Sequence, residues 1–167
     1  MQFAHRRLAL LALSLALFLF GCSGGEPGDT GVEDVGSVSQ ATTQTCFGAP
    51  LAGECRYEPV QAWASSVEGN SSAYQPSAAI DHDCTTRWSS AFSDPQWLKV
   101  DLGRARTLSR VLIHWETSAS SNYDLQVSDN TVDWTTIATK ANATITGSGN
   151  SRVDTLSGLT ATARRTG

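Results

Sequence analysis

The feature that most restricts the fold is an alternation of apolar and polar side chains over short segments. Residues 97–102 put three aliphatic side chains on one side of an extended chain, and Lys99 and Asp101 on the other. Tyr123–Ser128 alternates in the same way. A period of two predicts β-strands, and no segment of the sequence shows a sustained helical stripe. Gly103 predicts the end of the first strand.

Further strands are predicted along the same half of the chain. Arg110–Trp115 is rich in β-formers, Trp134–Thr139 follows a turn at residues 129–133, and Val153–Leu156 closes the series. Short strands separated by Gly, Ser and Asp turns are typical of an antiparallel β-sandwich. At 167 residues the chain has room for one such domain and a leader.

The first residues have the features of a signal peptide. Arg6 and Arg7 give a basic start, and Leu8–Phe20 is an uncharged apolar run. That run is shorter than the roughly 20 residues that a membrane-spanning helix needs. Residues 1–21 are therefore predicted to be a leader that directs export.

The sequence Leu19-Phe20-Gly21-Cys22 ends this leader and resembles the lipobox of bacterial lipoproteins. The resemblance implies cleavage before Cys22, lipidation of its thiol, and contact with a membrane only through that lipid anchor. Ser23, in place of an aspartate, is similar to lipoproteins that reach the outer membrane or cell surface. A plain secretory signal with a cysteine nearby by coincidence is the alternative.

The segment 22–45 differs in composition from the rest of the chain. It is rich in Gly, Ser, Thr and acidic residues and has no apolar periodicity, so it is predicted to be a flexible tether. The whole chain carries a formal net charge of −4 and has no cluster of Lys and Arg. Nucleic acid is therefore excluded as a partner, because neutralisation of phosphates supplies most of that binding.

Three cysteines remain if Cys22 carries lipid. Export to an oxidising compartment predicts a disulfide among Cys46, Cys55 and Cys84. Cys46 and Cys55 enclose a short loop and are the expected pair, although sequence alone leaves the connectivity open. Cys84 is then predicted to be a buried free thiol.

Two adjoining segments carry a family resemblance. Ala79–Ser90 has two aspartates one residue apart followed by Thr-Arg-Trp-Ser-Ser, and Asp94–Gly103 has a turn, a strand and a glycine. With Ala64–Glu68, Val111–Glu116 and residues 123–134 in the same order, the chain resembles the F5/8 type C (discoidin-like) domain, close to carbohydrate-binding modules of family 32. The resemblance implies a jelly-roll, galactose-binding-like, all-β antiparallel sandwich over residues 46–167.

The chain departs from this family after Leu159. The family continues with a Tyr-Val-Arg strand and a last strand that closes the sandwich, whereas this chain has only residues 160–167. We therefore expect a domain that is truncated at its C-terminus, with an open sheet edge. A fragment of a longer protein would have this form.

The aspartate loop is a candidate calcium site. Asp81, Asp83 and Thr86, with backbone carbonyls such as that of Ala78, offer the oxygen ligands that Ca²⁺ takes. The family resemblance implies a structural calcium here. The alternative is that the two aspartates only cap the turn by accepting backbone hydrogen bonds. His82 fits no zinc-ligand spacing and is predicted to be a solvated loop residue.

Sugar recognition requires an aromatic platform and convergent polar groups. The resemblance places such a site in loops at one end of the sandwich, and the candidate ligand-binding residues are Tyr74, Arg87, Phe92, Glu116 and Asn122. An inward structural pair with an acid is the alternative role of Arg87. The other large aromatic residues are expected in the core: Trp88, Trp97, Trp115, Tyr123 and Trp134.

No catalytic motif accompanies these residues. The sequence has no nucleophile-elbow serine motif, no zinc-binding histidine pair and no phosphate-binding glycine loop. The first hypothesis is a non-catalytic carbohydrate-binding module on a lipid-anchored surface protein, with galactose-like or glucan units as ligands. The alternatives are a discoidin-like adhesion domain for protein or lipid headgroups, and the targeting fragment of a larger glycoside hydrolase.

Overall fold

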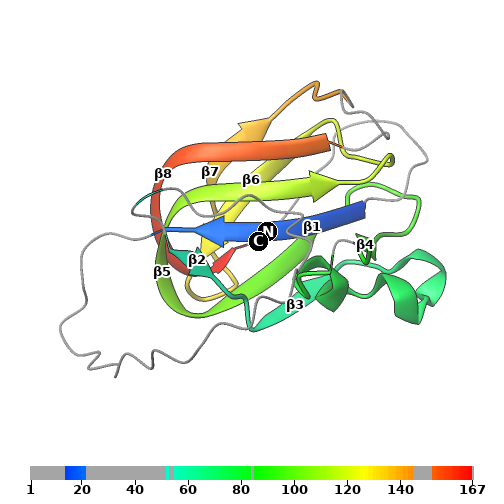
Figure 1. The fold of residues 1–167 in the computed structure, drawn as a ribbon, viewed down its shortest axis with the longest axis horizontal. Helices are drawn as coiled ribbons and strands as arrows, with labels where there is room; N and C mark the ends of the chain where they lie inside the picture. The colour runs from blue at the N-terminus through cyan, green and yellow to red at the C-terminus, as the bar shows by residue number, and fades with distance from the viewer. Residues whose placement is uncertain (1–13, 22–51, 53–54, 84, 145–151, 167) are drawn as a thin grey trace.

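The computed structural model describes residues 14–21, 52, 55–83, 85–144 and 152–166. These residues form strands and three short 3₁₀ helices (Figure 1). The elements are β1 (Ser14–Phe20), β2 (Arg56–Tyr57), β3 (Gln61–Ala64), η1 (Glu68–Asn70), η2 (Ser72–Tyr74), η3 (Pro76–Ala79), β4 (Trp88–Ser89), β5 (Leu98–Trp115), β6 (Tyr123–Ser128), β7 (Thr135–Lys140) and β8 (Arg152–Thr166).

Two long strands, β5 and β8, connect the layers of the fold. They pair antiparallel along most of their length, with register shifts between Asp101 and Arg106 and between Leu108 and Arg110. Figure 1 shows both strands curving together. The first part of β5 pairs with β3 and the second with β1, while the last residues of β8 pair with β6. The predicted all-β antiparallel sandwich is confirmed.

The buried side chains lie between these layers. Leu98 and Val100 from the first part of β5, and Val111 and Ile113 from its second part, are fully buried. Three of the predicted core aromatic residues join them, namely Trp88, Trp115 and Tyr123. For Trp97 and Trp134 the core prediction was wrong, because both side chains are only half-buried.

The strand predictions hold for the segments with the clearest alternation. Tyr123–Ser128 is β6 as predicted, and Arg110–Trp115 lies within β5. The predicted stop at Gly103 was wrong, because β5 continues through this residue to Trp115. Gly103 has a φ of 76°, a left-handed conformation that glycine adopts without a Cβ penalty. It therefore lies in the stretch of irregular register and does not end the strand.

Part of the apolar run that was predicted to belong to a leader forms β1. This strand pairs antiparallel with β5 and also with β2 and β4. Leu19 and Phe20 are fully buried, and Arg110 lies over the Phe20 ring at 4.2 Å. In the described part of the chain, β2 and β4 pair with no other strand. Removal of the leader stays a prediction, and β1 occupies an interior position in the sheet.

Several predictions fall outside the described residues. These are the lipidated Cys22, the tether over residues 22–45, Cys46, and the buried thiol of Cys84. Cys55 is described, and it is disulfide-bonded. The described residues include no helix with the length and apolar character needed to cross a membrane.

Candidate functional site

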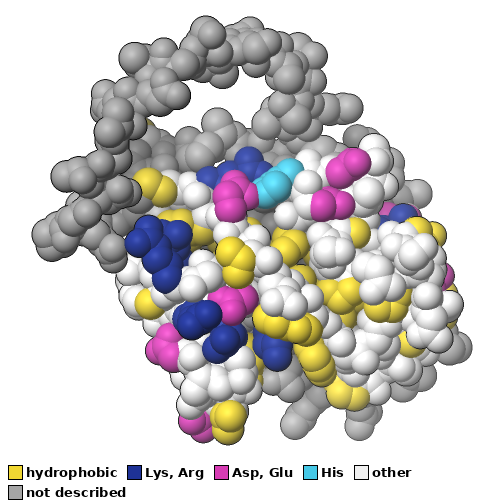
Figure 2. Space-filling view, turned by 90° about the horizontal axis from the view of Figure 1, so that it is seen from below, with side chains coloured by type: hydrophobic (Ala, Val, Ile, Leu, Met, Phe, Trp, Pro, Cys, Tyr) yellow, Lys and Arg dark blue, Asp and Glu magenta, His cyan; other side chains and the backbone are white. Residues whose placement is uncertain are grey.

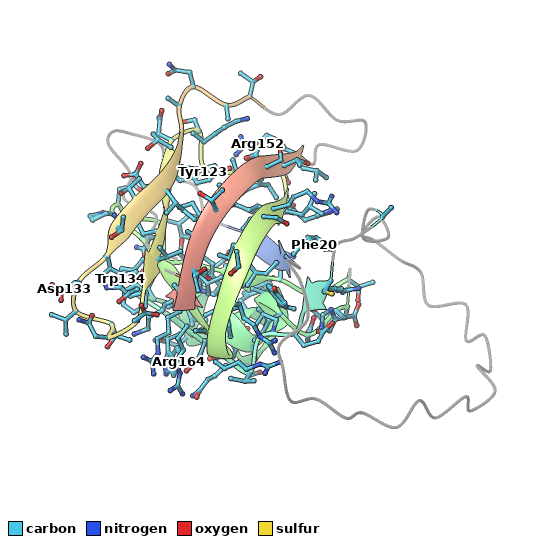
Figure 3. The ribbon with its side chains drawn as sticks, turned by 90° about the vertical axis from the view of Figure 1, so that its left-hand side faces the viewer. Phe20, Tyr123, Asp133, Trp134, Arg152 and Arg164 are labelled. Atoms are coloured by element: carbon cyan, nitrogen blue, oxygen red, sulfur yellow. The ribbon has the colours of Figure 1, made fainter. Side chains whose placement is uncertain are left out.

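Two of the candidate ligand-binding residues, Arg87 and Glu116, lie next to strand ends that meet at one end of the sandwich. Trp115, the last residue of β5, is paired with Arg152, the first residue of β8. Leu15 of β1 lies opposite both Trp115 and Trp88, so Arg87 and the loop after β5 start from neighbouring strand ends. Figure 3 shows Tyr123 and Arg152 at this end, with Trp134 and Arg164 toward the other.

Three of the predicted residues are brought together here. The guanidinium carbon of Arg87 lies 4.7 Å from the centroid of the Tyr74 ring. The charge of Arg87 also acts on Glu116. Tyr74 comes from η2, Arg87 precedes β4, and Glu116 follows β5. The three side chains, which we call the Tyr74–Arg87–Glu116 cluster, join loops that are far apart in the sequence.

Glu116 is held as a carboxylate. Partial burial acts to raise the pKa of this carboxyl, but hydrogen bonds from Thr117 and Ser118 and the charge of Arg87 outweigh it and lower the pKa below 4.5. The Thr117 hydroxyl donates to Oε1, and the Ser118 amide donates to Oε2 at 3.1 Å. The site therefore carries a charged acceptor and a charged donor side by side at neutral pH.

The other two predicted residues lie outside this cluster. Asn122 stands at the end of the same loop as Glu116, where its Oδ1 accepts from the Asn142 amide at 3.0 Å and its Nδ2 donates to Ser121 Oγ. Phe92 is exposed, with half of its side-chain surface open to solvent. These contacts of Asn122 are to its own loop and to Asn142, and not to the cluster.

A buried ionic network lies beneath the loop that carries Glu116. Oδ2 of Asp154 accepts hydrogen bonds from Trp115 Nε1 at 2.7 Å and from the Tyr123 hydroxyl at 2.9 Å. Arg152 donates to the same oxygen at 3.0 Å and to the carbonyl of Ser120 at 2.5 Å. Burial and then the charge of Asp154 raise the pKa of Tyr123 far above 10. The network thus anchors the loop through Ser120.

Sequence reasoning missed this network. The strand at Val153–Leu156 was predicted, but its apolar Val153 is 49% exposed while Asp154 and the preceding Arg152 are buried. The ordinary rule puts the valine inside and the charges outside. A signal was nevertheless present, because a tryptophan and a tyrosine at neighbouring strand ends need polar partners when they are buried.

The aspartate loop is closed by its own hydrogen bonds. Asp81 Oδ1 accepts from the Asp83 amide at 2.9 Å, and Asp81 Oδ2 accepts from the Thr86 hydroxyl at 2.7 Å. Asp83 Oδ1 accepts from both the hydroxyl and the amide of Thr85, which lowers the Asp83 pKa. These are the turn-capping contacts that were weighed as the alternative to calcium.

The atoms that the same loop could offer to a calcium ion are of the kind that calcium binds. The side-chain oxygens of Asp81 and Thr86 lie within hydrogen-bond distance of each other, and every candidate ligand atom is an oxygen, which Ca²⁺ prefers. Within the described residues, no three His, Cys, Asp or Glu side chains come together in the manner of a metal centre built from such groups. A calcium ion here would therefore depend on hydroxyl and carbonyl oxygens as well as on the two aspartates.

His82 is exposed as predicted, yet it is not simply solvated. Its Nδ1 lies 2.5 Å from an Arg56 nitrogen, and its Nε2 lies against the Glu58 carboxylate. Its φ of 64° turns the side chain within the aspartate loop. On the face drawn in Figure 2, a histidine lies between acidic and basic side chains. The histidine therefore ties the aspartate loop to the chain around β2.

The family of the chain follows from a match over residues 78–165 to the model described as F5/8 type C, NedA-like, galactose-binding domain. Because this match spans more than half of the 167 residues, the chain belongs to that family. No curated protein matches the sequence.

Solved structures of similar fold are carbohydrate-binding modules. Chitosan-binding module 1 of a chitosanase/glucanase from Paenibacillus sp. IK-5 is 34% identical, with a TM-score of 0.54, 66% of this chain covered and 80% of that chain. Module 2 of the same enzyme, in complex with chitotriose, is 27% identical, with a TM-score of 0.56 and coverages of 66% and 81%. A Clostridium perfringens family 32 module, in complex with GalNAc-β-1,3-galactose, shares the fold at 20% identity, with a TM-score of 0.51 and coverages of 64% and 79%.

Proposed function

We propose that this chain is a non-catalytic carbohydrate-binding module. The observation that carries the proposal is the Tyr74–Arg87–Glu116 cluster, which places an aromatic ring, a guanidinium and a carboxylate at one end of a galactose-binding-like sandwich. An aromatic side chain gives a pyranose an apolar face to pack on, and charged donors and acceptors hold its hydroxyl groups. Binding of carbohydrate by similar modules supports the same function for this chain.

The sugar class that the site favours is a β-linked amino sugar. The modules that share 27% and 34% identity with this chain bind chitosan or a chitosan trimer. Glu116 remains a carboxylate because its pKa is lowered, so it offers an ion pair to the ammonium group of a glucosamine unit. Arg87 then holds the carboxylate in place and donates to ring hydroxyls. Galactose-like and glucan units lack the ammonium and would bind through Tyr74 and Arg87 alone.

Two further parts of the proposal concern how the module is held. Lipidation of Cys22 would attach the protein to an outer membrane or cell surface, with residues 22–45 as the tether. Cleavage before Cys22 would remove β1, so this part of the proposal requires a sheet that folds without that strand. Calcium in the loop of Asp81, Asp83 and Thr86 would stiffen the chain that leads into Arg87 and Trp88. The support for calcium is the all-oxygen donor set, and its contribution would be structural.

One observation favours a second candidate function. Phe92 exposes half of its surface in a loop, as an adhesion domain for protein or lipid headgroups would require. A targeting fragment of a larger glycoside hydrolase would use the same sugar site as the first candidate. Retention on polysaccharide and retention on anionic lipid vesicles therefore separate the two functions.

The test is affinity electrophoresis of the full chain through native gels that contain chitosan, a galactan, a neutral β-glucan or no polysaccharide. We expect the protein to migrate more slowly in the chitosan gel, and free glucosamine trimer to restore its migration. A matched set of gels with the Glu116→Gln variant should show weaker retardation with chitosan and no change with the neutral glucan. Equal migration in every gel would overturn the proposed function, and retention only on vesicles would replace it with the adhesion function.

A further inference from the structure

A second group of aromatic side chains lies outside the loop end, on the pair formed by β3 and β5. Trp63 of β3 lies opposite Lys99 of β5 in the antiparallel register. The Lys99 ammonium is 5.0 Å from the centroid of the Trp63 ring and 5.6 Å from that of Trp97. The two indoles and the ammonium between them form one unit, which we call the Trp63–Lys99–Trp97 platform.

The platform lies on the outer face of the sandwich. Along β5, Leu98 and Val100 are fully buried, so Lys99 between them points away from the core. Along β3, Ala62 and Ala64 pack against the core, so Trp63 also points outward. The side chains of Trp63, Trp97 and Lys99 are half-buried. Two large aromatic rings therefore keep part of their surface open to solvent on the outer side of the sheet.

The charged group of the platform is the Lys99 ammonium. Lys99 makes no ion pair with an acid in the described part of the chain, and the nearest acid along β5, Asp101, is taken up by Arg164 at 3.5 Å and Arg165 at 3.4 Å. A second acid, Asp129, also lies at these arginines, where its Oδ1 accepts from the Arg164 amide at 2.9 Å. The charge that the platform offers is therefore that of Lys99 itself. The loop end differs, because there Glu116 balances Arg87.

We propose that the Trp63–Lys99–Trp97 platform is a second carbohydrate site, which takes the pyranose ring of an acidic sugar such as a uronic acid. The apolar face of the ring would pack on an indole. The sugar carboxylate would accept hydrogen bonds from the Lys99 ammonium, which has three donors and no acid partner in the described residues. A cationic chitosan chain is repelled by the same charge, so the two sites select different sugars.

The cation–π contacts alone do not account for this arrangement. A single indole would be enough for a cation–π contact with a lysine. One indole from β3 (Trp63) and one from the residue just before β5 (Trp97) flank a single ammonium and give a broad surface that carries a charge. An aromatic surface with a charge suits the apolar face and the carboxylate of an acidic sugar ring. Trp63 and Lys99 are therefore the residues to test.

The experiment is isothermal titration calorimetry of the full chain with trigalacturonate and, in parallel, with the neutral trimer of galactose. We expect trigalacturonate to bind and the neutral trimer to bind at least about tenfold more weakly, which corresponds to about 1.4 kcal/mol. Raising the salt concentration should weaken the first and leave the second unchanged. Equal affinity for the two trimers, or no binding of trigalacturonate, would overturn the proposal.

Matched variants locate the binding. Trp63→Ala and Lys99→Met should each lower trigalacturonate affinity at least tenfold, whereas Trp134→Ala, which removes an indole that is also half-buried, should leave it unchanged. Lys99→Met keeps an unbranched stem, so it remains informative if Trp63→Ala melts early. Tyr74→Ala separates the two sites: loss of trigalacturonate binding in that variant, with Trp63→Ala unaffected, would place the acidic sugar at the loop end and overturn the platform.

Discussion

The Arg87 guanidinium lies over the Tyr74 ring, 4.7 Å from its centroid. Arg87 is also close enough to Glu116 for its charge to lower the pKa of that carboxyl. The aromatic ring therefore meets a charged pair instead of standing alone. Such an arrangement gives a sugar both a surface for its apolar face and a donor and acceptor for its polar groups. The account of function depends on this relationship.

The buried Asp154 should be the most sensitive polar residue in the domain. Asp154→Ala leaves Arg152 buried without its carboxylate and removes the acceptor of Trp115 and Tyr123. Breaking a buried pair in this way costs about 3–5 kcal/mol of unfolding free energy. Urea unfolding followed by tryptophan fluorescence measures the loss. Thr155→Ala, on the exposed side of the same strand, is the control and should stay within about 0.5 kcal/mol.

The strand β1 should be essential for the sheet as described. Phe20→Ala removes a fully buried ring that packs under Arg110, and truncation of a buried phenylalanine costs about 3–5 kcal/mol. Thermal melts of the full chain before and after this change measure the effect. An unchanged melting temperature would show that β1 does not contribute to the folded protein, and would favour the role of these residues as a leader that is removed.

Stability should depend on pH through His114. Burial lowers the pKa of this imidazole below 6.5, so the unfolded chain takes up a proton at a higher pH than the folded one does. The contribution of the neutral His114 to the free energy of unfolding is fully present above pH 6.5. It is lost as the pH drops from 6.5 toward the pKa of the folded state. Urea midpoints at pH 7.5, 6.5 and 5.5 measure this slope. The His114→Gln variant should have a smaller slope over the same interval, and an identical slope would contradict the assignment.

Calcium should raise the melting temperature if the aspartate loop binds it. A ligand at 100 times its dissociation constant stabilises the folded state by about 2.7 kcal/mol. We expect a higher melting temperature in millimolar Ca²⁺ than in chelator, and no such difference in an Asp81→Asn, Asp83→Asn double variant. Mg²⁺ is the control ion, because it demands a stricter geometry. Identical melts of the wild-type chain in the two buffers would leave these aspartates as caps of the turn.

Much of the fold was predictable because the sequence alternates strictly where one face of a strand is buried. Tyr123–Ser128 and the buried side chains of Leu98 and Val100 follow this rule. The rule failed where polar contacts decide the outcome. Asp154 is turned inward by three donors, and Val153 is consequently exposed. The local pattern does not contain that information, because two of the donors, Trp115 and Tyr123, come from other strands.

The candidate site was predictable in part, because the order of the loops follows the order of the family's motifs. Tyr74, Arg87 and Glu116 were named from loop positions in the family order, and the fold brings them together. Trp97 was expected in the core because aromatic residues usually are buried, yet it faces outward with Lys99. The side of a strand on which a residue falls depends on the phase of the alternation, which a single tryptophan next to a turn does not define.

The most direct test of the central claim is a calorimetric titration of chitotriose into the full chain and into its Tyr74→Ala variant, with Trp134→Ala as the control. The account predicts that the wild-type chain and the control bind equally, and that Tyr74→Ala binds at least about tenfold more weakly, or about 1.4 kcal/mol. Thermal melts of all three chains verify that each is folded. Equal binding by the folded Tyr74→Ala variant, or no binding by the wild-type chain, would contradict the account.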